Sequence, residues 1–214
     1  MAFPTTNAAE ELPAVNQILA SVGQAPVTTL DQTNPDVAIA YDTLTNVSRE
    51  VQAEGWTFNT EEYVKFTPDS DNEIQIANNI LQIDLHDEVD NQYEAIRKKD
   101  LSDGILKLYE KVNHTFTWDS TKWSEGVRCN VVYLYDWVEL PIPVQDYIVA
   151  RTASIVSSRI VGDPQQYQML SQKEQWNRSQ ALEYECRQGD YTFFGHQRGK
   201  KPYDAYQPYK ALYR

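Results

Sequence analysis

The sequence has few cysteines and no long apolar segment, and both shortages exclude classes of protein. Its 214 residues include only two cysteines, Cys129 and Cys186, which are far apart and belong to no CxxC or Cys/His motif. Neither a disulfide framework nor a structural zinc site is indicated, and we expect both cysteines to be core thiols. No stretch approaches roughly 18 apolar residues, and the first residues lack the features of a signal peptide. We expect a soluble protein with no membrane anchor that is not exported through a signal peptide.

Positive charge is also scarce. Lys and Arg number 19 against 31 Asp and Glu, which gives a formal charge of −12. A protein that grips nucleic acid by neutralising phosphates would be basic, so this function is disfavoured. Hydrophobic residues make up 41% of the chain, with 8 Gly and 10 Pro, which is typical of a folded globular protein and not of a disordered acidic one.

The usual signatures of catalysis are missing. The three histidines, His86, His114 and His196, do not pair at a metal-ligand spacing, and no GxSxG, GxxxxGK[ST] or GxGxxG motif occurs. We therefore predict no metal, no cofactor and no enzymatic activity. The one enzymatic alternative is glycoside hydrolysis by paired carboxylates, for which Glu61-Glu62 and Asp69-Ser70-Asp71 are candidates. Acidic clusters beside a turn are normally solvated surface.

Helix signals lie in the first and last thirds of the sequence. The predicted helices are Glu10 to Val22, Asn34-Pro35 to Gly55, Pro141 to Gly162, and Asp163-Pro164 to about Gln188. In the second and fourth, Asn or Asp precedes Pro, which combines an N-cap with a proline at the first helical position.

Between the helices the apolar period falls to two. Alternation at Val64/Phe66, Ile74/Ile76, Leu81/Ile83/Leu85, Leu106/Leu108 and Val127 to Tyr135 predicts five or six mostly antiparallel strands, with turns at Asn78-Asn79 and Asp103-Gly104. The fold class is α+β: a four-helix bundle-like body with an inserted β-sheet domain. The predicted boundaries are residues 1–55 for the first helical half, 56–135 for the β domain and 136–189 for the second helical half.

The last segment, residues 190–214, differs from the rest in charge and aromatic content. Five basic against two acidic residues give it a charge of +3, so residues 1–189 carry −15, and it holds five tyrosines. A solvated terminus is one interpretation. We favour an extended Tyr-rich arm that docks on a partner. The candidate partner-binding residues are Arg198, Lys200, Lys201, Tyr203, Tyr206, Tyr209 and Tyr213.

Five strings taken in order carry a family resemblance over about residues 10–188. They are Leu12 to Val27, Arg49 to Asn59, Pro68-Asp69 with Ile80 to Asp84, Leu108 to Phe116, and Tyr135 to Pro141. Together they resemble the tail tubular protein A family of short-tailed phages, which are head-to-tail adaptor proteins. The sequence departs from the family pattern near Tyr93 to Lys99 and at the Tyr-rich end.

The resemblance implies a structural virion protein and not an enzyme. It implies a homo-oligomeric ring of twelve copies in the virion tail, assembled in the host cytoplasm, between the portal protein and a tail nozzle of the tubular protein B type. DNA would pass through the ring without specific binding, and an acidic wall suits this role because it repels phosphates. Candidate channel-lining acids are Asp69, Asp71, Glu73, Asp87, Glu88 and Asp90.

Two other functions stay open at this point. Some relatives are suspected of degrading cell-envelope glycans, which would make the chain a tail-associated hydrolase with an acidic pair such as Glu61 and Glu62. The second alternative is an acidic protein that binds a host factor.

Overall fold

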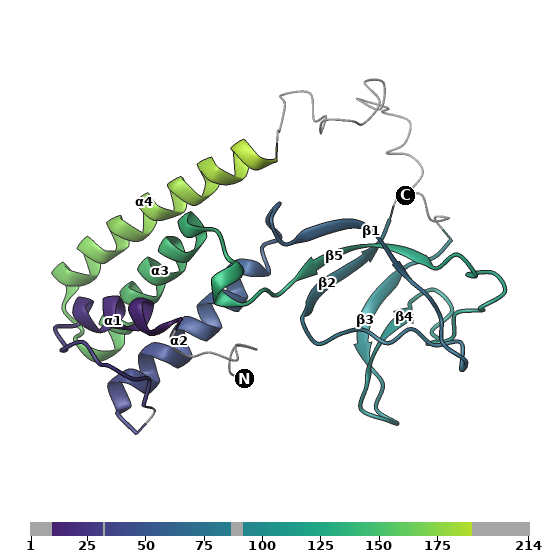
Figure 1. The fold of residues 1–214 in the computed structure, drawn as a ribbon, viewed down its shortest axis with the longest axis horizontal. Coiled ribbons are helices and arrows are strands. Elements are labelled where there is room, and N and C mark those ends of the chain that lie inside the picture. The colour runs from purple at the N-terminus through teal and green to yellow at the C-terminus, as the bar shows by residue number, and fades with distance from the viewer. Residues whose placement is uncertain (1–9, 32, 87–91, 190–214) are drawn as a thin grey trace.

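The computed structural model describes residues 10–31, 33–86 and 92–189, and it places four helices at one end of the molecule and the strands at the other (Figure 1). The helices are α1 (Leu12–Ser21), α2 (Pro35–Gln52), α3 (Ile142–Ile160) and α4 (Pro164–Gln188), with a short 3-10 turn at Trp137–Glu139. The strands are β1 (Thr60–Phe66), β2 (Ile80–Leu85), β3 (Ala95–Lys99), β4 (Leu106–Glu110) and β5 (Val127–Tyr133). The prediction of a mixed protein with four helices and antiparallel strands is confirmed.

The two predicted helix starts have the expected cap geometry. The side chain of Asn34 accepts the N–H of Asp36 at 3.1 Å, and that of Asp163 accepts the N–H of Gln165 at 3.0 Å. In each case the following proline occupies the first helical position, where no N–H partner is needed. Gly162 has φ +69° after α3, a left-handed conformation that ends the helix at little cost for a glycine.

Helix α3 is central to the helical half, because it packs against α1, α2 and α4. Apolar side chains at helical spacing on α1, α2 and α3 fill the core between them. The fully or almost fully buried ones are Val15, Ile18, Leu19, Val37, Leu44, Val47, Val51, Val144, Tyr147, Ile148 and Val156. Helix α4 differs, since Ala181 is its one buried residue.

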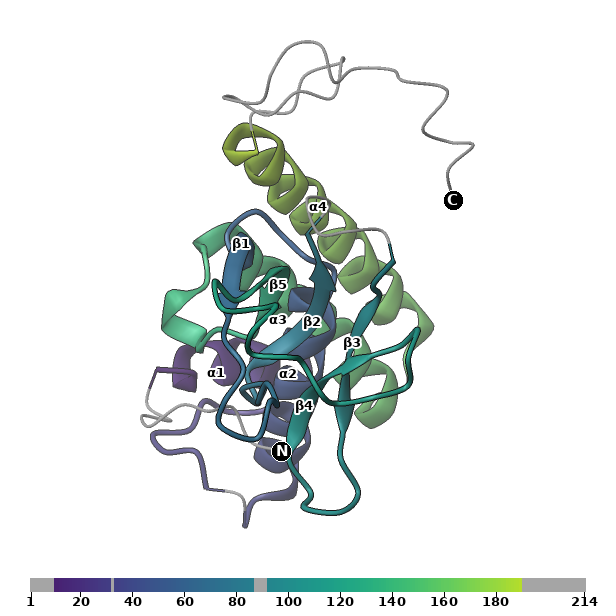
Figure 2. The same cartoon turned by 90° about the vertical axis from the view of Figure 1, so that its right-hand side faces the viewer.

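The strands form two antiparallel groups, which Figure 2 shows from the sheet end with the helices behind them. One is a three-stranded sheet in the order β1-β5-β2, and the other is the hairpin β3-β4. The predicted strand at Ile74 and Ile76 is wrong as an independent strand. This segment is a short extended stretch beside β4, where Ile76 N donates to Leu106 O and Leu108 N donates to Ile74 O.

Both predicted turns are present, but one has a different conformation from the one expected. The hairpin turn at Asp103-Gly104 uses a left-handed glycine with φ +76°. The Asn78-Asn79 turn closes with Ile80 N donating to Ala77 O, and neither asparagine has a positive φ. The left-handed non-glycine residues are Tyr63, Asn72 and His114 among those described. Tyr63 lies where the register of β1 shifts against β5.

The sheets enclose a second core built around β5, β2 and Trp118. The Trp118 indole N–H donates to the carbonyl of Leu108 at 2.9 Å, which satisfies its polar atom inside the core. Cys129 is fully buried there, as expected, and burial together with the nearby charge of Asp84 raises the pKa of its thiol to about 12. The prediction is wrong for Cys186, which is exposed.

Two buried amides join the helices to the sheet. The side chain of Gln52, at the end of α2, donates to Tyr135 O at 3.2 Å and accepts Tyr135 N at 2.8 Å. Asn59 accepts the N–H of Trp56 at 2.8 Å and donates to the carbonyls of Gln52 and Tyr133 at 2.9 and 2.8 Å. These amides therefore bind the connection that leaves α2 to the connection that returns toward α3.

We expect Asn59→Ala to lower the free energy of unfolding by about 2–4 kcal/mol, because it removes three hydrogen bonds and leaves buried backbone groups without partners. Urea denaturation followed by circular dichroism measures this change. The control is Asn113→Ala at an exposed turn, which should change stability by less than about 0.5 kcal/mol. Equal losses in the two variants would contradict the role of Asn59.

Candidate interaction surfaces

The described candidate channel acids, Asp69, Asp71 and Glu73, share one loop after β1. The Asp69 carboxylate accepts the N–H groups of Asp71 and Glu73, both at 2.9 Å, so this side chain shapes the loop. Asp71 is exposed, and Glu73 is half-buried against Lys107. The other three candidates, Asp87, Glu88 and Asp90, lie outside the described residues. One of the three described acids is therefore free of a structural contact and presented to solvent.

Lys107 holds together three acidic segments, and the sequence reasoning missed it. Its side chain is buried, and its ammonium lies 2.6 Å from Glu73, 3.0 Å from Asp100 and 2.5 Å from Asp103. Hydrogen bonds to Asp103 and Glu73 raise the pKa of Lys107. The backbone N–H and hydroxyl of Ser102, and then Lys107, lower the pKa of Asp100 to about 2. The loop, the hairpin turn and β4 are fixed to one another by this cluster.

The candidate hydrolase pair, Glu61 and Glu62, lies on β1, an edge strand of the sheet. Both residues are exposed, next to the register shift at Tyr63. Neither lines the cavity between the strands. All seven candidate partner-binding residues of the arm lie outside the described residues: Arg198, Lys200, Lys201, Tyr203, Tyr206, Tyr209 and Tyr213.

Helix α4 has one side packed on its own chain and one side exposed. Glu174 accepts a hydrogen bond from Ser154 of α3, and Asn177 donates to the carbonyl of Asp146. On other sides of the helix, Met169 is 65% exposed and Trp176 is 66% exposed. Seven residues apart, these two lie on the same side, two turns from each other. We call this pair of residues the α4 patch. Large apolar side chains exposed together on a helix are typical of an interaction surface.

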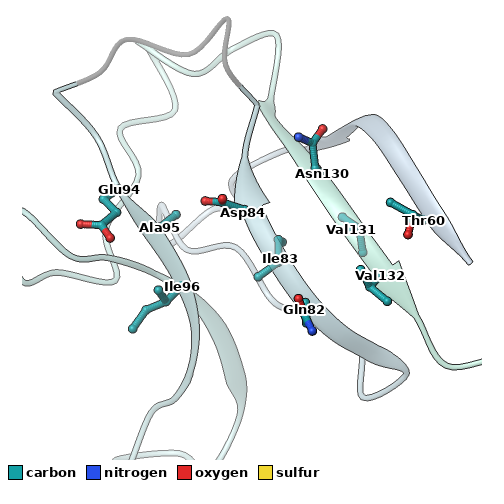
Figure 3. A pocket seen from close by; sticks show the side chains of 10 residues that line it. All are labelled: Thr60, Gln82, Ile83, Asp84, Glu94, Ala95, Ile96, Asn130, Val131 and Val132. Atoms are coloured by element: carbon teal, nitrogen blue, oxygen red, sulfur yellow. The ribbon is translucent and has the colours of Figure 1, made fainter. Parts of the chain in front are cut away.

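A cavity of about 440 Å³ opens between β2 and β3, and we call it the sheet cavity (Figure 3). Strands β1, β2, β3 and β5 and the residue before β3 contribute its lining, which is Thr60, Gln82, Ile83, Asp84, Glu94, Ala95, Ile96, Asn130, Val131 and Val132. Asp84 pairs with Asn130 and Thr60 with Val132 in the sheet register, so each pair lies on one face. The Asn130 amide oxygen is buried without a hydrogen-bond partner among the described residues.

The described residues include neither a cluster of metal ligands nor a membrane-spanning helix. They contain no group of three His, Cys, Asp or Glu side chains arranged to hold a metal ion. Among them, too, no helix has both the length and the apolar character needed to span a bilayer.

A family model described as Tail tubular protein matches residues 12–191. The match covers every helix and strand described above. No curated protein matches the chain.

We expect the Lys107 cluster to make stability sensitive to acid. Asp100 and Asp103 have pKa values below the ordinary 3.8, so the stability they contribute is present above about pH 4 and is lost as the pH falls toward 2. Lys107→Gln should lower stability at pH 7 and reduce its loss between pH 4 and 2, because Asp103 then loses the hydrogen bond to Lys107 that contributes most to its lowered pKa. Urea denaturation over this pH range measures both effects.

The control for that experiment is Lys99→Gln, which removes an exposed lysine of β3 and should keep the acid dependence of the wild-type chain. If Lys107→Gln shows the same pH dependence as Lys99→Gln, the cluster does not govern acid stability.

Proposed function

This chain belongs to the tail tubular protein family and is a structural component of a phage tail, and from that premise we propose that it forms the head-to-tail adaptor of a short-tailed phage. Twelve copies form a ring between the portal protein and the tail nozzle, and DNA leaves the capsid through its bore. The ring assembles in the host cytoplasm and becomes part of the virion tail. The role is non-catalytic.

The observation that carries this proposal is the α4 patch. A ring requires a heterologous contact, in which one surface of a copy meets a different surface of the next. Met169 and Trp176 are exposed on a helix that buries a single residue within its own chain. A neighbouring copy that covers this side of α4 would complete the packing of a four-helix bundle-like body. The inserted β domain, residues 56–135, then projects from the helical halves, residues 1–55 and 136–189.

The negative charge of the chain supports the proposal that DNA passes through the ring without binding to it. Residues 1–189 carry a formal charge of −15. Of the candidate channel acids, Asp71 keeps an exposed carboxylate, whereas Glu73 is neutralised by Lys107. We assign the lumen role to Asp71 together with Asp87, Glu88 and Asp90, and a structural role to Asp69 and Glu73.

The C-terminal segment, residues 190–214, is the arm that attaches the adaptor in the virion. Its tyrosines bury rings while their hydroxyls stay hydrated, and its basic residues meet acidic surfaces on a neighbouring copy or on the portal. The anchors are the seven residues Arg198, Lys200, Lys201, Tyr203, Tyr206, Tyr209 and Tyr213.

The α4 patch can be tested by assembly. Purified wild-type protein mixed with portal should sediment as a ring complex, and Trp176→Glu should shift the protein to monomer, because a buried unpaired charge opposes the contact. Analytical ultracentrifugation and negative-stain microscopy measure the outcome. The matched control, Val112→Glu, changes an apolar side chain of 55% exposure on the β half and should leave the ring intact. A wild-type chain that stays monomeric and ignores portal would refute the adaptor function.

The lumen acids can be tested by DNA release. Virions that carry Asp71→Lys, Asp87→Lys, Glu88→Lys and Asp90→Lys together should assemble and eject DNA more slowly, with a delay that shrinks as salt rises, because phosphate contacts release counterions. Time-resolved ejection in vitro measures the rate. Glu125→Lys, at an exposed turn, serves as the control for added charge. Ejection rates unchanged by the fourfold substitution at every ionic strength would exclude these acids from the DNA path.

A further inference from the structure

The polar lining of the sheet cavity consists of two carboxylates, the amides of Gln82 and Asn130 and the hydroxyl of Thr60, and it includes no Lys or Arg. Two carboxylates, Asp84 and Glu94, belong to its lining, and Figure 3 shows Asp84 next to Asn130 on the neighbouring strand, with Glu94 on the far side of the opening. Lys111 pairs with Glu94 at 2.6 Å, whereas Asp84 has no ion pair among the described residues. The buried amide oxygen of Asn130 also lacks a donor. A buried acceptor without a partner costs free energy, so this cavity favours a ligand that donates hydrogen bonds.

The rest of the lining defines the shape of that ligand. Val132, two residues after Asn130 on β5, lies on the same face as Asn130 and Asp84 and supplies apolar surface, which suits the methylene stem of a long side chain with a cationic head. A volume of about 440 Å³ lies within the range of roughly 300–1,000 Å³ typical of pockets that hold organic ligands. A lysine or arginine side chain has this combination of stem, charge and donors.

We propose that the occupant is the basic stretch Arg198-Gly199-Lys200-Lys201 of the same chain, which folds back onto the sheet in the unassembled subunit. The end of α4 is held to the connection that leads into β1, because Glu185 accepts the N–H of Thr57 at 2.9 Å, three residues before Thr60 of the cavity lining. The stretch follows Gly189 by nine residues, and nine extended residues reach roughly 30 Å. Three cations in four residues then meet Asp84 and Asn130, at the high effective concentration that a short tether provides.

In the unassembled subunit the arm is then bound to its own sheet cavity, and a partner must displace this contact during assembly. The same basic residues that dock on a partner are held on their own subunit until that partner is present. The cavity and the arm are separate from the α4 patch, so the resting contact does not depend on ring formation.

The test is disulfide trapping in the full-length chain. Ile96 lines the cavity and is 39% exposed, so Ile96→Cys and Gly199→Cys are combined with Cys186→Ser to remove the exposed native thiol. Dilute monomer under mild oxidant should form an intramolecular disulfide, read as a monomeric band of increased mobility, at a rate independent of protein concentration. The control pair uses Ile39→Cys on α2, which is 38% exposed, and should cross-link about tenfold more slowly.

Charge variants separate this contact from random collision. Asp84→Lys in the trapping background should slow the disulfide about tenfold, and reversal of Arg198, Lys200 and Lys201 to Glu should restore the rate. Glu125→Lys should have no effect, and circular dichroism confirms that each variant is folded. Equal rates for the Ile96 and Ile39 pairs, cross-links only between copies, or a rate unaffected by Asp84→Lys would each overturn the proposal.

Discussion

The structure depends on the hydrogen bonds that Gln52 and Asn59 make between the two connections that link helices and sheet. The chain leaves α2, builds the whole β half and returns to α3, so about ninety residues are inserted into a helical framework between these points. Loop closure of this length costs conformational entropy. Two fully buried amides offset part of this cost by binding the outgoing and returning segments to each other. Through them the separate cores of the two halves take up one relative position.

The helices differ in how much of their surface is buried within the chain. The proposed function depends on this difference, because the least buried helix is the one available to a partner. Helices α1, α2 and α3 bury their apolar side chains against one another, and Trp118 is buried in the core of the sheets. Helix α4 contributes one buried residue and is held to the rest by polar contacts at Ser154, Asp146 and Thr57. Its apolar residues are therefore available to another molecule. In the sheet cavity, the amide oxygen of Asn130 is buried without a hydrogen-bond partner among the described residues.

Local chemistry accounts for what could be predicted from the sequence. The pairs Asn34-Pro35 and Asp163-Pro164 predict helix starts, and α2 and α4 begin at these prolines. The alternation from Val127 onward predicts the strand β5, which is buried mainly on one face. The exposure of Cys186 was missed because α4 packs on a single neighbour. The stretch at Ile74 and Ile76 alternates like a strand, yet it pairs with β4 over too short a length to be one. The Lys107 cluster and the sheet cavity were out of reach, because the groups that meet there lie on different strands and loops. The division of Asp69, Asp71 and Glu73 into structural and solvent-exposed side chains could not be predicted either, because it depends on contacts within the loop and with Lys107.

The Lys107 cluster has an evolutionary consequence. One ammonium bridges three carboxylates, so any substitution of the lysine alone leaves Glu73, Asp100 and Asp103 to repel one another. Loss of one acid, in contrast, leaves a lysine that still has two partners. The order in which substitutions can be accepted is therefore constrained: an acid must be lost before the lysine can be. Lineages that retain the lysine can vary any single acid, whereas lineages without it should have replaced several of these positions together.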